Sequence, residues 1–263
     1  IINTTYPFVT DHEKIEDCID ELVDYAEDSI PVLSETKELL GVITAQDVVE
    51  AVDDEMGEDY AKLAGLTDEE DLRETTKESM KKRLPWLIIL LFLGMGVSSV
   101  VGAFEAVVAV LPIVMCFQSL ILDMAGNVGT QSLAVTIRVL MDENLTGKQK
   151  LHLVWKEMKV GFVNGLLLGS LAFVFIGIYI ACFKHNAWLQ AFLISGCVGV
   201  SLMVAMVISS LVGTLIPIFF HKIKIDPAVA SGPLITTVND LVAVVTYYGL
   251  AWLFLIQIMQ IVS

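Results

Sequence analysis

A carboxylate lies inside one of the most apolar stretches of this sequence. Asp240 falls within residues 228–262, a run without Lys or Arg that also contains Thr236 and Thr237. Spacings of three and four positions place these three side chains on one face of a helix. A charged carboxylate at the centre of a bilayer costs about 2.5–3.5 kcal/mol, so it requires water, a partner or a cation. We interpret Asp240 as a carboxylate that faces a cation path, the alternative being a protonated Asp bonded to a neighbouring helix.

A second group of oxygen-bearing residues interrupts another apolar run, residues 106–140. The group consists of Asp123, Gly126, Asn127, Gly129, Thr130 and Gln131. Its glycines predict a helix break whose carbonyl groups turn away from the helical ladder, which a membrane tolerates only where the backbone lines protein or water. Carbonyl, amide and carboxylate oxygens suit Mg²⁺ or Ca²⁺ and suit soft metals poorly. The alternative is a break with ordinary packing, but two such segments without counter-charges favour an ion path.

Two further acidic residues flank these segments. Asp226 precedes Pro227 at the entrance to the last run, where it either caps the helix or attracts cations. Glu105 lies between the first two runs and is either solvated or attracts cations at the opposite end. The sequence contains no HExxH, GxSxG or GxxxxGK[ST] motif and no cluster of Cys and His, so we do not expect an enzyme.

Composition divides the chain into two parts. Residues 1–83 hold 24 of the 31 acidic residues and 8 of the 16 Lys and Arg residues, a formal net charge of −16. The other 180 residues carry a formal net charge of +1. They also hold most of the apolar side chains, which give the whole chain a mean hydropathy of +0.71. This composition excludes a soluble enzyme built from the whole chain. The net charge of the acidic part also has the wrong sign to bind the phosphate groups of nucleic acid. We expect a small soluble module followed by an integral membrane domain, and the first residue, Ile1, suggests a fragment of a longer protein.

Five apolar runs are long enough to cross a bilayer as helices, which takes about 20 residues. They are residues 85–104, 106–140, 160–183, 187–220 and 228–262. We expect the second and fifth to be irregular and the fourth to break near Gly213 and Pro217. The third run contains glycines spaced by four residues, Gly161, Gly165 and Gly169. This spacing predicts a smooth helix face that another helix can approach closely. Lys and Arg concentrate before the first run and in the connections after the second and fourth, which predicts a cytoplasmic N-terminus and an external C-terminus.

The acidic segment predicts a small α/β unit. A helix-like pattern over residues 12–26 precedes two strand patterns, residues 29–33 and 39–44. An acidic helix follows, which we expect to run through residues 45–83. Two copies of such a segment would repel each other unless cations lay between them. Divalent ions bridging facing carboxylates would couple the cytosolic cation concentration to the helix that leads into the first run, although each acidic residue is also consistent with a solvated face.

Several segments together resemble one protein family. Residues 112–131, which include Asp-Met-Ala-Gly-Asn-Val-Gly-Thr-Gln, and residues 226–240, Asp-Pro-Ala through Val-Asn-Asp, resemble the two signature segments of the MgtE magnesium transporters. Residues 30–47 resemble the second CBS (cystathionine-β-synthase-type) domain of that family. Glu55-Met-Gly-Glu-Asp is similar to the start of its connecting plug helix. The sequence departs from the family in Ala125, where Gly is frequent, and in Asp123, a carboxylate that many members lack.

The resemblance implies a mainly α fold in three parts. These are a partial α/β CBS-type module (1–50), an acidic connecting or plug helix (51–83) and a polytopic membrane domain of five helices (84–263). It also implies a homodimer with a Mg²⁺-selective pore, in which Asp240 holds hydrated Mg²⁺. Gly126 and Asn127 would lie on the same path and Asp226 near its cytoplasmic mouth, while the role of Asp123 stays open. Regulatory Mg²⁺ would bind at the acidic positions Asp47, Glu50, Glu55, Glu58 and Asp59.

Residues and resemblance together predict a Mg²⁺ channel or transporter in the inner or plasma membrane, gated by cytosolic Mg²⁺. Because Mg²⁺ loses its water reluctantly, one carboxylate per subunit can hold the hydrated ion and still release it. One alternative is a coupled exchanger of Mg²⁺ for Na⁺ or H⁺. Another is a membrane sensor of cations or nucleotide that transports nothing. The expected partners are a second copy, the lipid bilayer and Mg²⁺, with ATP at the CBS module left open and no nucleic acid.

Overall fold

The computed structural model describes residues 8–13, 29–67, 72–110, 112–142, 145–184, 186–230 and 232–258. The chain forms two compact units. The first comprises Ile1–Ala61 with Asp68–Asp71, and the second comprises Lys62–Thr67 with Leu72–Ser263.

The first unit contains a three-stranded sheet. Its strand order is β1–β2–β3, with β1 (Val9–Thr10) parallel and β3 (Leu39–Thr44) antiparallel to the central β2 (Ser29–Leu33). The predicted strands over residues 29–33 and 39–44 are confirmed. The helix expected over residues 12–26 lies almost entirely outside the described residues.

The core of this sheet is small. Val9 and Ile30 are buried, and only Ile43 and Val48 pack against them as partly buried hydrophobic residues in the described part of the unit. Four apolar side chains bury little area, and the hydrophobic effect contributes roughly 25 cal/mol for each Å² removed from water. The described residues alone therefore contribute little hydrophobic stabilisation to this unit.

The acidic helix is shorter than expected. α2 (Ala45–Leu63) begins at the predicted residue but ends well before residue 83. Gly65 follows with a φ of +82°, the left-handed conformation in which glycine commonly terminates helices. A new helix then starts with a capping box, in which the Thr75 N–H donates to Glu78 Oε2 at 2.8 Å. The prediction of one helix through residues 45–83 is therefore wrong, because these stop and start signals divide it.

Among the described residues of the second unit, five helices are long and apolar enough to cross a membrane, as predicted. Their elements, with the short helices between them, are α3 (Thr76–Ala103), α4 (Glu105–Val110), η1 (Pro112–Phe117), α5 (Gln118–Asp142), α6 (Gly147–Phe183), α7 (Trp188–Lys222), η2 (Pro227–Val229), α8 (Gly232–Ala251) and η3 (Trp252–Ile258). η1 and η2 are 3₁₀ helices, and η3 is a π-helical extension of α8.

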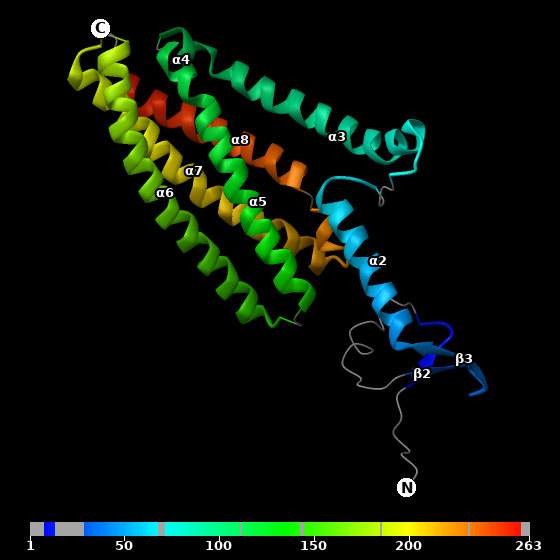
Figure 1. The fold of residues 1–263 in the computed structure, drawn as a ribbon. Coiled ribbons are helices and arrows are strands. Elements are labelled where there is room, and N and C mark those ends of the chain that lie inside the picture. The colour runs from blue at the N-terminus through cyan, green and yellow to red at the C-terminus, as the bar shows by residue number, and fades with distance from the viewer. Residues whose placement is uncertain are drawn as a thin grey trace. The chain divides into compact units, whose positions relative to one another are not determined.

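α7 is the most buried helix of this unit and packs against α6, α5 and α8, while α5 also packs against α8 (Figure 1). The largest buried side chains include Tyr247 and Tyr248 of α8, Ile121 of α5 and Ile194 of α7. α3 packs mainly on α8 and has no fully buried residue. Val97, Val100 and Val101 pack against the core in part, while many of its other apolar side chains are exposed.

Both α5 and α7 are continuous where we expected breaks. α5 runs through Gly126 and Gly129, and α7 runs through Gly213 and Pro217. The glycines serve close packing instead, since a Cβ atom added to Gly213 would collide with the carbonyl oxygen of Gly129. A glycine costs a helix only about 1 kcal/mol relative to alanine. An unpaired backbone group in a bilayer costs several kcal/mol, so the helix persists.

The glycine face of α6 is confirmed, and its partner is α7 of the same chain. A Cβ atom on Gly165 would lie 2.9 Å from the Cα atom of Met203, and one on Gly169 would lie 2.6 Å from the carbonyl oxygen of Gly199. Gly161 faces the same helix. The absent side chains therefore allow the two backbones to approach closely.

Candidate cation site between α5 and α8

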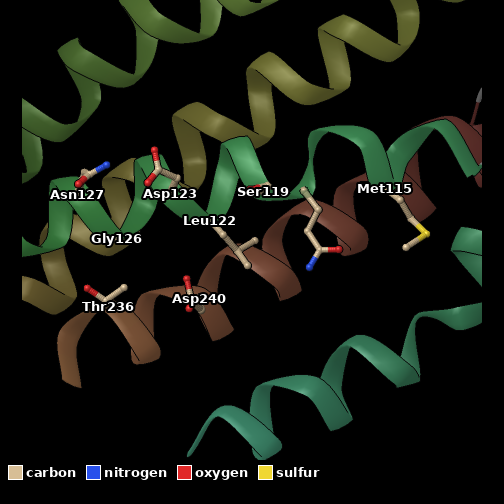
Figure 2. Close-up of a pocket in the computed structure, with 9 residues that line it drawn as sticks. Met115, Ser119, Leu122, Asp123, Gly126, Asn127, Thr236 and Asp240 are labelled. Carbon is tan, nitrogen blue, oxygen red and sulfur yellow. The ribbon is translucent and has the colours of Figure 1, made fainter. Parts of the chain in front are cut away.

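A pocket of about 490 Å³ lies between α5 and α8 (Figure 2). The residues that line it are Met115, Gln118, Ser119, Leu122, Asp123, Gly126, Asn127, Thr236 and Asp240. Four of them are sequence candidates: Asp123, Gly126, Asn127 and Asp240. The structure thus brings together two polar segments that are more than 100 residues apart in the chain.

Helical periodicity explains how each side of the pocket is built. On α5, Asp123 and Asn127 are four residues apart and lie on the same face. On α8, Thr236 and Asp240 have the same spacing and face α5. A Cβ atom added to Gly126 would lie 3.2 Å from Cγ2 of Thr236, so this glycine lets the two helices meet closely beside the carboxylates.

The electrostatic character of the pocket is negative. Asp123 and Asp240 are its charged lining residues, and none of the described residues that line it is Lys, Arg or His. Asp123 and Asn127 are exposed in this single chain, and Asp240 is half-buried. Hydroxyl and amide groups of Ser119, Gln118 and Asn127 supply further oxygen atoms. Such a set of oxygens suits a hard cation such as Mg²⁺.

Threonine hydroxyl groups bond to the helix backbone around this pocket. Thr130 Oγ1 donates to the carbonyl oxygen of Asn127 at 2.9 Å, and Thr236 Oγ1 donates to that of Gly232 at 2.9 Å. The expectation that α5 presents unwound carbonyl groups to an ion is therefore wrong. Any ion in this pocket would meet side-chain oxygens first.

Four lining residues were missed by the sequence analysis, namely Met115 of η1 and three residues of α5. Gln118, Ser119 and Leu122 extend the Asp123–Asn127 face of α5 by one turn toward its N-terminus. The spacing of three and four residues was the signal that would have found them. Gln118 is also held in place, because Tyr248 donates its hydroxyl hydrogen to Gln118 Oε1 at 2.5 Å.

Asp226 lies outside this pocket. Its Oδ1 accepts a hydrogen bond from the Ala228 N–H at 2.8 Å at the start of η2, and its Oδ2 lies 3.0 Å from Lys62 Nζ. Of the two roles considered for this residue, the structure thus contains the helix cap. The ion pair with Lys62 offsets the negative charge that would attract a cation.

Among the described residues of the first unit, the acidic candidates are not gathered into a metal site. Asp47 Oδ2 accepts hydrogen bonds from the backbone N–H and the hydroxyl of Thr44, both at 2.7 Å. These bonds lower the pKa of Asp47. Glu50 and Glu58 are exposed, and the side chain of Glu55 is not among those that the structure describes. Within the described ranges, no three Asp, Glu, His or Cys residues lie close enough together to hold a metal ion. Asp59 is therefore not part of such a group either.

Known proteins and two family models are similar to this chain. Residues 118–250 match the family model described as MgtE, divalent cation transporter, and residues 1–54 match that of the CBS domain. Proteins named magnesium transporter MgtE from Enterococcus faecalis and Bacillus subtilis are each 38% identical, over 91% and 86% of this chain. One of the same name from Thermus thermophilus is 30% identical over 97%.

The chain spans about half the length of these relatives, namely 51%, 48% and 55% respectively. The family model alone covers half of the chain, including α5 to α8 and both sides of the pocket. Its five apolar helices agree with a multi-pass membrane protein. The chain therefore belongs to the MgtE family of divalent cation transporters.

Proposed function

We propose that this chain forms part of a Mg²⁺ channel or transporter whose ion path runs along the pocket between α5 and α8. The observation that carries the proposal is the placement of Asp123 and Asp240 in one pocket that none of the described basic residues lines. Such carboxylates are expensive in a membrane and are normally retained for function. The names of the relatives support Mg²⁺ as the transported ion.

A hydrated ion fits this chemistry better than a dehydrated one. Mg²⁺ keeps several of its waters and prefers a near-octahedral shell of oxygens. In this proposal Asp240 and Asn127 accept hydrogen bonds from the waters of the ion, and Asp123 adds a second negative charge. Weak, water-mediated contacts let the ion leave as readily as it enters.

A second copy of the chain would complete the path. The pocket is open on one side, and Asp123 and Asn127 are exposed in the single chain. In a homodimer, two such walls would face each other and enclose the ion. The distribution of Lys and Arg supports a cytoplasmic N-terminus and an external C-terminus in the cell membrane.

Regulation by cytosolic Mg²⁺ is the further part of the proposal. The exposed Glu50 and Glu58 of α2 belong to a segment with a large excess of negative charge. Since one chain places no three ligands together within the described residues, regulatory ions would lie between carboxylates of two chains. Bound ions would draw the two acidic segments together and close the path.

The test is Mg²⁺ uptake into proteoliposomes with the wild-type protein and the variants Asp240→Asn and Asp123→Asn. A hydrogen bond to a charged group contributes about 1.5–3 kcal/mol, so we expect Asp240→Asn to reduce uptake about tenfold or more. Glu105→Gln is the control, because Glu105 is an exposed carboxylate outside the pocket. Uptake that persists unchanged in Asp240→Asn would contradict the assigned path, and a requirement for a Na⁺ or H⁺ gradient would indicate a coupled exchanger.

A further inference from the structure

A second pocket, of about 590 Å³, lies where α6 begins and α7 ends. Its polar lining residues are Lys150 of α6, His221 and Lys222 of α7, and Lys224 and Asp226 of the connection that follows. Two isoleucines complete it. This pocket shares no residue with the one between α5 and α8, so the transport proposal does not account for it.

The charge of this second pocket is positive. Its single acidic lining residue, Asp226, is paired with Lys62 at 3.0 Å. Neither Lys222 nor Lys224 forms an ion pair with a carboxylate in the described part of the chain. Three lysines therefore converge on a hollow whose one negative charge is already offset.

The position of Lys150 adds to this concentration of charge. Its Nζ atom lies 3.2 Å from Nδ1 of His221. An ammonium group can only donate hydrogen bonds, so Nδ1 must act as the acceptor. The contact holds a cation of α6 against the end of α7, in the same pocket as Lys222 and Lys224.

The turn after α7 gives the pocket a preformed wall. The Ile223 N–H donates to the carbonyl oxygen of Phe219 at 3.1 Å, and the Lys224 N–H donates to that of His221 at 3.2 Å. Lys224 itself has a φ of +59° and reverses the chain. A wall ordered in advance lowers the entropy that a ligand must offset on binding.

Exposed apolar residues flank Lys222 and Lys224 in the sequence. Phe219, Ile223 and Ile225 are 56%, 46% and 43% exposed. They lie where the apolar part of α7 ends and Lys222 begins the polar connection. Basic residues beside exposed apolar residues are typical of the boundary between hydrocarbon and headgroups, where lysine stems lie along acyl chains and their ammonium groups reach phosphate.

We propose that this pocket binds the headgroup of an anionic phospholipid. The phosphate lies among Lys150, Lys222 and Lys224, and the acyl chains lie along Phe219 and Ile223. In the orientation proposed above, the pocket faces the cytoplasmic leaflet, whose anionic lipids attract basic residues at the membrane surface. Charge complementarity and the apolar rim together favour a lipid over a soluble anion.

The test compares lipid retention by the purified protein in detergent, with phosphatidylglycerol or phosphatidylcholine added, by native mass spectrometry and by the thermal midpoint. The test variant is Lys222→Gln with Lys224→Gln. The matched control is Lys156→Gln with Lys159→Gln, two exposed lysines of α6 outside the pocket. We expect the test variant to bind phosphatidylglycerol about tenfold more weakly than the control and the wild type.

Three results would overturn the proposal. The first is equal retention of phosphatidylglycerol by the test variant and the wild type, with both folded by their midpoints without lipid. The second is equal retention of phosphatidylcholine, which would indicate an apolar surface only. The third is displacement of phosphatidylglycerol by millimolar inorganic phosphate, which would assign the pocket to a soluble anion. Lipid retention is measured in detergent without Mg²⁺, whereas the transport proposal is tested by Mg²⁺ uptake. Either proposal can therefore fail without the other.

Discussion

The carboxylate of Glu157 lies 3.0 Å from the hydroxyl oxygen of Ser132, inside the contact between α5, α6 and α7. Ser210 of α7 lies 2.8 Å from Ser132 Oγ and donates to the carbonyl oxygen of Glu157, also at 2.8 Å. Three contacts thus involve two hydroxyl groups, which together carry only two hydrogens. A donor at the position of the Glu157 carboxylate, such as the amide group of glutamine, would supply the third.

This arrangement predicts different effects for two substitutions of Glu157. Glu157→Ala leaves the buried Ser132 without one partner, which we expect to cost about 1–3 kcal/mol of stability. Glu157→Gln can donate from its amide and should cost less than about 1 kcal/mol. Thermal unfolding in detergent measures both, with the exposed Lys156→Ala as control. If Gln is as damaging as Ala, the charge of Glu157 is required and the count of hydrogens is wrong.

Gly129 is predicted to tolerate no side chain. A Cβ atom there would collide with the amide of Asn239, which is fully buried between the helices. We expect Gly129→Ala to destabilise the protein by about 1–3 kcal/mol through overpacking. Gly96→Ala in α3 is the matched control, because no atom lies within 4 Å of its added Cβ.

The control should be neutral or stabilising by up to about 1 kcal/mol, since alanine is the better helix former. Chemical denaturation of the three proteins side by side gives the comparison. Equal stability of Gly129→Ala and wild type would mean that α5 and α8 pack less closely than the structure indicates.

Asp226 is predicted to act through two separable bonds. Asp226→Ala loses the cap on η2, worth about 1 kcal/mol, and the ion pair with Lys62, worth about 0–1 kcal/mol at such partial exposure. Asp226→Asn retains an oxygen for the cap and loses only the charge. We therefore expect the midpoint of thermal unfolding to fall more for Ala than for Asn. An Asn variant as unstable as Ala would show that the ion pair dominates.

The pairing of Asp47 with Thr44 predicts a pH dependence at the start of α2. Hydrogen bonds from the Thr44 hydroxyl and N–H lower the pKa of Asp47 below its ordinary value of 3.8. A lowered folded pKa means that the stabilisation is complete above the unfolded value and is lost as the pH falls through the folded one. Protection of the first turn of α2 from hydrogen exchange should therefore decrease below about pH 4.

This prediction is tested by measuring hydrogen exchange at the first turn of α2 in Asp47→Asn and in Glu50→Gln. The rates are corrected for the intrinsic dependence of exchange on pH. We expect the loss of protection with falling pH to be weakened in Asp47→Asn and retained in Glu50→Gln. Mg²⁺ should leave the effect unchanged, because the Asp47 carboxylate already accepts two hydrogen bonds. Protection that depends on Mg²⁺ at this turn would instead favour the regulatory site implied for Asp47.

Local signals predicted much of the fold. The strands over residues 29–33 and 39–44 follow from β-branched and apolar runs bounded by turn residues, and the start of α2 follows directly after Thr44. The five membrane helices follow from runs of about 20 apolar residues, because length and hydropathy alone decide whether a helix can span a bilayer. The membership of Asp123, Asn127 and Asp240 in one pocket agrees with their polarity inside apolar runs.

Other features depend on neighbours that lie far away in the chain. Gly126 and Gly129 looked like helix breaks, yet their role is to admit Thr236 and Asn239 from α8. Glu157 stands between Leu153 and Gly161 on the buried face of α6, although lysines flank it in the sequence.

The amino-acid sequence by itself determined which segments enter the membrane, which carry charge and which residues bear oxygen ligands, because these properties belong to single residues and short windows. Only the tertiary structure decided at which glycines two helices approach closely. It also decided that Asp226 caps η2 and pairs with Lys62, and that Glu157 bonds to Ser132. Those outcomes depend on the register in which one helix packs against another. Register is set by the fit of whole surfaces, which local composition does not encode.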